Sequence, residues 1–140
     1  MSYYTPSEIR KRRALQIGLG FSFPKGYELL TDAEIASAAN GVGPDAAPGG
    51  IRKILTALLP YGDLAADIHD VEFQMSNGTR KDFLAANERF RHNCRQWVVR
   101  TRSAMSPLRY LELFRLRRDF EILNGPAGWA AWKSAAERYN

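Results

Sequence analysis

Apolar residues recur every three or four positions along most of this chain, which is the spacing that gives an α-helix one buried face. The repeat is clear in the middle of the chain, at Leu64, Ile68, Val71 and Met75. Together with the turn and capping residues between the repeats, it predicts helices over 32–39, 51–59, 64–75, 80–105, 107–123 and 127–139. The pattern predicts no strand, so we expect an all-α fold.

Local signals place the ends of several helices. Thr31 and Glu34 have the spacing of a capping box, and Thr79 can cap the long helix that follows it. Four glycines and two prolines between positions 41 and 50 predict a loop. A tight turn at 76–78 should let the helices on either side pack as a central antiparallel pair. The seam of this pair would be lined by Phe83, Ala86 and Phe90, with Cys94 and Trp97 as further candidates.

The chain of 140 residues is long enough for one domain with one core. We expect residues 1–30 to form a basic and irregular lead-in, because 14–27 are rich in glycine and aromatic residues. No disulfide can form within the chain, since Cys94 is its one cysteine, and this favours a reducing compartment. No apolar run is long enough to cross a bilayer, and the N-terminal region lacks the order of a signal peptide. We therefore expect a soluble protein that is cytoplasmic, or delivered without a classical signal peptide.

Basic residues exceed acidic ones, giving a net charge of +5 and an isoelectric point near 9.6. Much of the excess lies between Arg80 and Arg118, where eleven lysines and arginines face three acids. Such a surface could meet nucleic acid, or the anionic head groups of a phospholipid membrane. It could also be a solvated helix surface, and charge alone does not distinguish these possibilities.

The pair His69-Asp70 is the strongest candidate for chemistry. On a helix the two side chains lie about 100° apart, so both can border one pocket. Asp70 offers carboxylate oxygens to Ca²⁺, and His69 can take a proton from a nucleophilic water. Main-chain carbonyls of the upstream loop could complete the metal site, and the N–H of its first glycine could stabilise an oxyanion. The loop positions concerned are Ala39, Gly41 and Gly43, with Gly41 supplying the N–H.

The order of these parts resembles the phospholipase A2 superfamily, in particular its small bacterial and fungal branch and phage- or prophage-type members with an Asn-Gly-x-Gly-Pro loop. The matching stretches are the loop at 39–44, the helix at 66–70 and the following helix at 80–93, so the likeness spans Thr31 to Asn93. Residues 94–140 would be additional helices. The resemblance implies a helical phospholipase A2-like core with a calcium-type loop and a central helix pair. It implies hydrolysis of the sn-2 ester of glycerophospholipids.

The chain departs from the family pattern at several positions. Ala39, Val42 and Ala66 stand where members usually have cysteines. Asn87 stands where the family places the aspartate that orients the histidine, and Phe73 replaces a tyrosine of the same network. An amide can accept a hydrogen bond but cannot stabilise an imidazolium by charge. We therefore expect a site that holds calcium but turns over slowly, or not at all.

The alternative is a non-catalytic, basic helical protein that binds DNA or a phage-assembly partner. On the remaining candidates, we expect Asp67 and Glu72 to face solvent rather than bind metal, although Asp67 could instead pair with an arginine. His92 should lie at the surface and Cys94 should be a buried thiol. Packing against the bundle is expected for Trp129 and Trp132.

Overall fold

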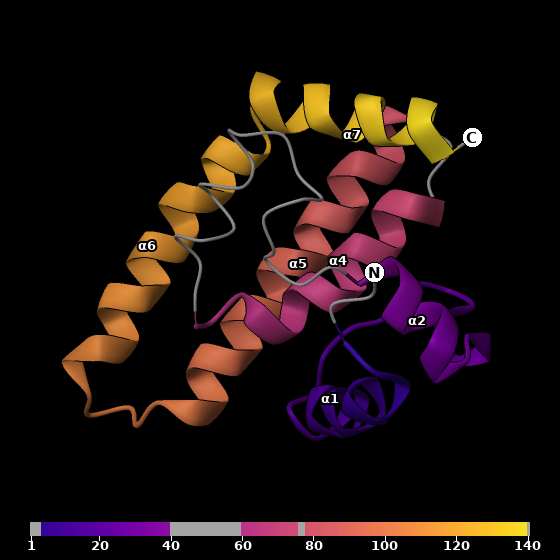
Figure 1. Cartoon of the computed structure of the whole chain (residues 1–140). Helices are drawn as coiled ribbons and strands as arrows, with labels where there is room; N and C mark the ends of the chain where they lie inside the picture. The colour runs from indigo at the N-terminus through magenta and orange to yellow at the C-terminus, as the bar shows by residue number, and fades with distance from the viewer. Residues whose placement is uncertain (1–3, 40–59, 76–77, 140) are drawn as a thin grey trace.

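The protein is described by a computed structural model over residues 4–39, 60–75 and 78–139. Within these ranges every regular element is a helix, which confirms the all-α prediction (Figure 1). The elements are α1 (Pro6–Gly18), a short 3₁₀ turn η1 (Tyr27–Leu29), α2 (Asp32–Ala38), α4 (Asp63–Met75), α5 (Arg80–Thr101), α6 (Pro107–Leu123) and α7 (Pro126–Tyr139). The loop expected at 41–50 and the helix expected over 51–59 lie outside the described residues.

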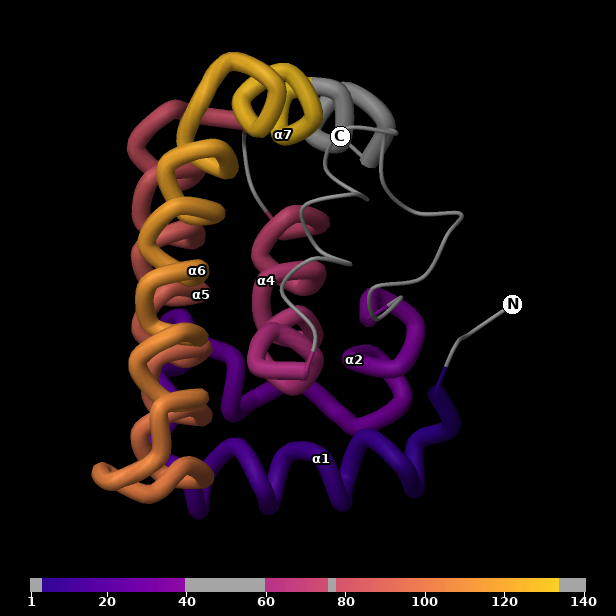
Figure 2. Tube along the Cα trace, turned by 90° about the vertical axis from the view of Figure 1, so that its left-hand side faces the viewer, coloured from indigo at the N-terminus to yellow at the C-terminus, as the bar shows by residue number. Residues whose placement is uncertain are grey.

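Helix α4 lies at the centre of the arrangement and contacts α1, α2, α5 and α7. Figure 2 shows α1 crossing below it, α7 crossing above it, and α5 with α6 along one side. Because neighbours surround it, α4 is buried on most of its circumference, including Leu64, Ala65, Ala66, Ile68 and Val71. A side chain on α4 is therefore held by another helix on almost any side it faces.

The expected irregular lead-in over residues 1–30 is wrong for residues 6–18, which form α1. The helix begins with a capping box that the glycine- and aromatic-rich composition obscured. Thr5 N–H donates to Glu8 Oε2 at 2.7 Å, and Glu8 N–H donates to Thr5 Oγ1 at 3.2 Å. Pro6 at the first helical position reinforces this start, because its fixed backbone angle suits a first turn.

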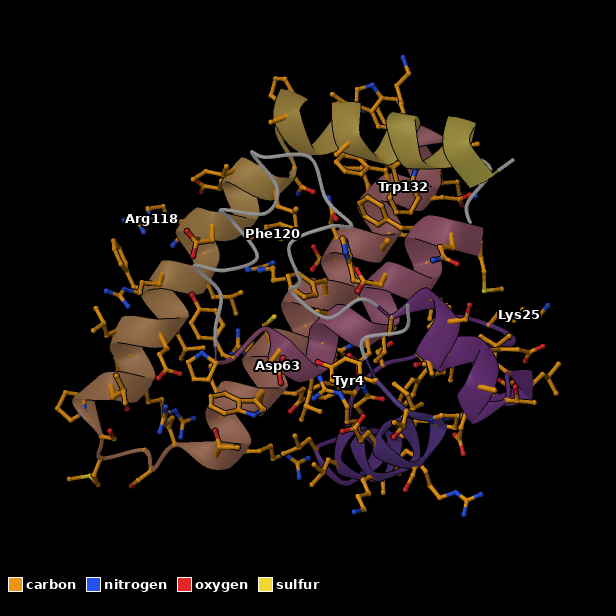
Figure 3. The ribbon with its side chains drawn as sticks, viewed as in Figure 1. Tyr4, Lys25, Asp63, Arg118, Phe120 and Trp132 are labelled. Atoms are coloured by element: carbon orange, nitrogen blue, oxygen red, sulfur yellow. The ribbon has the colours of Figure 1, made fainter. Side chains whose placement is uncertain are left out.

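Helix α1 is fastened to α4 by a buried ion pair. Arg12 donates to both carboxylate oxygens of Asp67, at 2.7 and 3.1 Å, and to Asp63 at 3.2 Å. Gln16 adds a hydrogen bond of 3.2 Å to Asp67. Tyr4, whose ring lies under the Arg12 guanidinium, and Asp63 are both labelled in Figure 3. Part of the basic N-terminal sequence therefore has a structural partner inside the molecule.

The side chain of Asp67 is 1% exposed, so the expectation that it faces solvent is wrong. The alternative expectation, that Asp67 pairs with an arginine, is confirmed. Burial raises the pKa of Asp67 to about 6, although the hydrogen bonds from Arg12 oppose that rise. A carboxylate so desolvated needs its arginine, since an unpaired buried charge is costly.

Helix α5 begins at the expected cap, with Asp82 N–H donating to Thr79 Oγ1 at 3.2 Å. It ends at Thr101, four residues before the end expected from the sequence. The residues expected on its inner face are all buried as predicted: Phe83, Ala86, Phe90 and Cys94. Trp97, the further candidate, is partly buried against the main core. Contacts between α4 and α5 include those of His69 with Asn87 and of Glu72 with Arg89.

Candidate functional site at the contact of two helices

His69 lies on α4 and is 2% exposed. Its imidazole Nε2 lies 2.9 Å from Oδ1 of Asn87 on α5. Two phenylalanine rings lie against the imidazole at a tilt, with centroid distances of 4.7 Å to Phe73 and 4.9 Å to Phe90. The structure therefore brings together the histidine and the residue that the family resemblance places beside it, in a setting that fixes the ring plane.

A second amide orients the first. Asn87 Nδ2 donates to Asn124 Oδ1 at 2.8 Å, so the Oδ1 of Asn87 is the atom left to accept from the histidine. His69 then carries its proton on Nε2, and Nδ1 is the unprotonated nitrogen of the neutral ring. Asn124 was not among the sequence candidates. Its one local signal is its place as the C-cap of α6, ahead of Gly125 and Pro126.

Burial sets the protonation state of this histidine. It lowers the pKa of His69 to about 4, and the hydrogen bond to Asn87 opposes the shift only in part. The imidazole is therefore neutral at pH 7, as a proton acceptor must be. An aspartate at position 87 would favour the charged ring, whereas the asparagine gives orientation without charge. The arrangement can accept a proton, but it stabilises the resulting imidazolium poorly.

Asp70 is partly buried and follows His69 on α4. One turn further along the same face, Gln74 Nε2 donates to the carbonyl of Ala38 at 3.3 Å. This bond holds the end of α2 against the face of α4 that carries Asp70. Ala39, the next residue, is buried, whereas Gly41 and Gly43 lie outside the described residues. The chain that leads toward positions 41 and 43 therefore leaves α2 at a point held against α4 by Gln74.

Oxygen donors of this kind fit Ca²⁺, which prefers carboxylate and carbonyl ligands. Within the described residues no group of three or more histidine, cysteine, aspartate or glutamate side chains could hold a metal. A calcium site would therefore use Asp70 together with main-chain carbonyls, of which Ala39 is the described member.

Phe73, which stands where the resemblance expects a tyrosine, contributes to packing. Its ring meets Trp132 of α7 edge-on, with centroids 4.6 Å apart, and it lies against the cluster of Phe83, Ala86 and Trp132. Figure 3 shows Trp132 beneath α7, directed toward the helix pair. A phenylalanine has no hydroxyl to extend the histidine network, so this position adds apolar contacts alone.

Glu72 was expected to face solvent, and this expectation is wrong. Its side chain is 11% exposed and forms an ion pair with Arg89 of α5. Burial raises the pKa of Glu72 to about 7, against the opposing charge of Arg89. The two residues line a cleft of about 310 Å³, whose other lining residues are Pro24, Lys25, Met75, Asp82, Ala85 and Trp132. Glu72 therefore stabilises the helix pair beside the histidine.

The expectations for His92, Cys94 and the two tryptophans are confirmed. His92 is exposed, and Cys94 is a buried free thiol. Trp132 is buried and Trp129 packs against Phe83, with centroids 5.3 Å apart. Both tryptophans therefore belong to the packing of α7.

Within the part of the chain that is described, no helix combines the length and the apolar character needed to cross a membrane. Comparisons of the chain with protein-family models, with curated proteins and with solved structures find no match.

Proposed function

We propose that this protein is a phospholipase A2-like hydrolase that uses calcium and acts on the sn-2 ester of glycerophospholipids, with turnover weakened by its own sequence. The contact of 2.9 Å between His69 Nε2 and Asn87 Oδ1 is the observation that carries the proposal. The family resemblance requires these two positions, which are 18 residues apart and on different helices, to meet. On the same resemblance we place the protein with phage- and prophage-type members.

The chemistry assigned to the histidine follows from its tautomer. With the proton on Nε2, the lone pair of Nδ1 can take a proton from a water that attacks the ester carbonyl. Asn87 and Asn124 hold the ring, while Phe73 and Phe90 restrict its tilt. In the proposal the loop backbone at Gly41 donates to the oxyanion, and Asp70 with the carbonyls of Ala39, Gly41 and Gly43 holds the metal. When bound, calcium would supply polarisation of the ester carbonyl.

We expect the proposed hydrolysis to be slow. A base with a pKa of about 4 has little tendency to take up a proton at neutral pH. The neutral Asn87 cannot improve this, because it brings no negative charge to the developing imidazolium. The same residues could hold a substrate and a metal without rapid hydrolysis.

The test begins with the metal. Calorimetric titration of Ca²⁺ into the wild type should show one site, which should be absent in Asp70→Ala and retained in the control Glu121→Ala, an exposed acid on α6. Release of fatty acid from phospholipid micelles should then require calcium and disappear in His69→Ala. Absence of both binding heat and thermal stabilisation up to millimolar calcium would reject a calcium-dependent hydrolase.

A further inference from the structure

Helix α6 exposes a group of large apolar side chains near its start. We call this group the α6 apolar patch; its members have exposed fractions between 42% and 89% and are Met105, Leu108, Tyr110, Leu111 and Phe114. Five large apolar residues within ten positions are a concentration that soluble surfaces rarely leave uncovered. In Figures 1 and 2 α6 runs along one edge of the molecule, so the patch lies at the periphery.

The inward face of α6 combines two core leucines, Leu116 and Leu123, with polar residues. Its buried residues include two acids, each with a partner on another element. Arg102 donates to Glu112 at 3.1 Å, and the Tyr61 hydroxyl donates to Asp119 at 3.3 Å. These bonds fix the rotation of α6 about its axis. Tyr110, Leu111 and Phe114, which lie on the other side of the helix, are therefore held outward by these contacts.

Arginines follow the patch along the exposed surface. Arg115, Arg117 and Arg118 are exposed within the four residues that follow Phe114, and Figure 3 shows Arg118 on the outer side of α6. Arg118 lies 3.7 Å from Asp119, yet 62% of its side chain is exposed. The acids of α6 are mostly buried, and Glu121 is the one exposed acid of this helix. The outward face is thus apolar in its first half and basic in its second.

An apolar surface that continues into a basic one favours some binding partners of α6 over others. A second copy packed in parallel through the same face would set arginines near arginines, which is unfavourable. Packed antiparallel, it would cover the apolar patch but leave the arginines without a counter-charge. Duplex DNA would satisfy the arginines, but it would leave the leucines and the phenylalanine without apolar contacts. The surface of an anionic bilayer offers both phosphates for the arginines and acyl chains for the apolar side chains. Tyr110 suits insertion, because its hydroxyl already donates to the carbonyl of Ala104 at 2.8 Å.

We propose that the α6 apolar patch and its neighbouring arginines dock this protein on the surface of an anionic phospholipid bilayer. The apolar side chains enter the boundary between head groups and acyl chains, while Arg115, Arg117 and Arg118 meet lipid phosphates. The docking involves neither His69 nor Asp70. It therefore goes beyond the proposed hydrolysis and can be tested without it.

The test is flotation of the full chain with vesicles of ether-linked lipids, which contain no ester to hydrolyse, in the presence of EGTA. Vesicles of mixed phosphatidylcholine and phosphatidylglycerol should bind the wild type, and pure phosphatidylcholine should bind it at least about tenfold more weakly. Leu111→Ser with Phe114→Ser should reduce binding at least about tenfold. The matched control is Ile122→Ser, an exposed apolar residue of α6 outside the patch, which should bind as the wild type does.

Charge is tested separately with Arg115→Gln and Arg117→Gln, which should lower binding most at low salt. Each variant is compared with the wild type by its helical circular dichroism and melting temperature, so that lost binding is read only from folded protein. Failure of the wild type to float with anionic vesicles at low salt would overturn the docking, as would unchanged binding of the double serine variant. A dimer in solution that the serine changes dissociate would also overturn it, in favour of a second copy. A missing calcium site would instead count against the proposed hydrolysis alone.

Discussion

At the scale of single residues, the site consists of a histidine held by two amides in series. Asn124 orients Asn87, and Asn87 orients His69, so the ring is fixed in one tautomer. Each bond is neutral, and in a fully buried position this keeps the imidazole uncharged. A carboxylate at position 87 would both orient the imidazole and stabilise its charged form, whereas Asn87 orients it only.

A carboxylate at position 87 should raise the rate of the proposed hydrolysis. We expect Asn87→Asp to raise the pKa of His69, because a negative charge favours the imidazolium. Calcium-dependent fatty acid release should rise at least about tenfold, since a buried aspartate beside a catalytic histidine contributes strongly to turnover. Asn124 can accommodate the change by rotating its amide so that the NH₂ group faces the new carboxylate. Asn87→Ala serves as the matched variant and should lower activity; an unchanged rate in Asn87→Asp with calcium bound would refute this account of the defect.

The buried histidine should also make stability depend on pH. Its pKa of about 4 in the folded protein lies below its ordinary value of 6.5, so between these pH values the unfolded chain binds a proton that the folded one does not. The free energy of unfolding should therefore fall as the pH drops from 6.5 toward 4. The raised pKa values of Asp67 and Glu72 act in the opposite sense, so the histidine must be isolated by comparison.

The comparison is urea unfolding of the wild type and His69→Gln at pH 7 and pH 5. The difference in unfolding free energy between them should shrink by about 2 kcal/mol on acidification. A difference that stays constant over this range would mean that His69 is not desolvated as described.

Some residues of the candidate site could be predicted from the sequence, and others could not. The family resemblance pointed to His69 and Asn87, and the helix periodicity could place them on facing elements. Asn124 gave no such indication, because it reaches Asn87 from the end of a helix 37 residues away. Asp67 and Glu72 were misjudged for a related reason. Periodicity shows which face of a helix is polar, but not which neighbouring helix will bring an arginine to that face.

At the scale of elements, capping residues predicted helix ends better than composition did. Thr31 and Thr79 cap their helices as expected, and Pro107 begins α6. Helix α1 was missed although Thr5 and Glu8 form the same kind of box. Its apolar repeat is weak because one side of the helix is anchored by Arg12 and Gln16 rather than by apolar residues. Periodicity alone does not detect a helix whose buried face is polar.

The junction between α6 and α7 depends on one glycine. A Cβ built at Gly128 would lie 1.8 Å from the carbonyl oxygen of Leu123, which is backbone and cannot rotate away. We expect Gly128→Ala to displace α7 and to cost more than about 2 kcal/mol of unfolding free energy. The contacts of Trp132 with Phe73 and Phe83 should weaken, so its near-ultraviolet circular dichroism should change.

Gly18 is the matched control, because a Cβ added there meets nothing within 4 Å. It lies in the last turn of α1, where alanine is the better helix former, so Gly18→Ala should leave stability unchanged or raise it slightly. Equal effects of the two substitutions would contradict the close approach of α7 to the end of α6.

At the scale of the whole molecule, the polar side chains of α4 bond to several neighbouring helices. Asp67 binds α1 through Arg12, while His69 and Glu72 bind α5 through Asn87 and Arg89. Gln74 binds the end of α2. The candidate site is therefore built into the same helix that holds the others together, and it should open only when much of the molecule opens.

Cys94 can report that opening. It is fully buried in the main core, and burial raises the pKa of its thiol. We expect negligible modification by a thiol reagent in native buffer, with a rate that rises with urea in parallel with the loss of helical circular dichroism. Rapid modification of protein with a native spectrum would show that the core around α5 opens by itself.

The ion pair between α1 and α4 also sets an order of events during synthesis. The carboxylates that receive Arg12 follow it by 51 and 55 residues, so the N-terminal helix leaves the ribosome well before its counter-charges exist. At ordinary translation speeds the interval is roughly 3 to 10 seconds, long compared with the folding of an isolated helix. Helix α1 should thus become protease-resistant only after α4 has been synthesised. Limited proteolysis of nascent chains halted before and after Asp67 emerges should show α1 cut readily in the first and protected only in chains that extend beyond it.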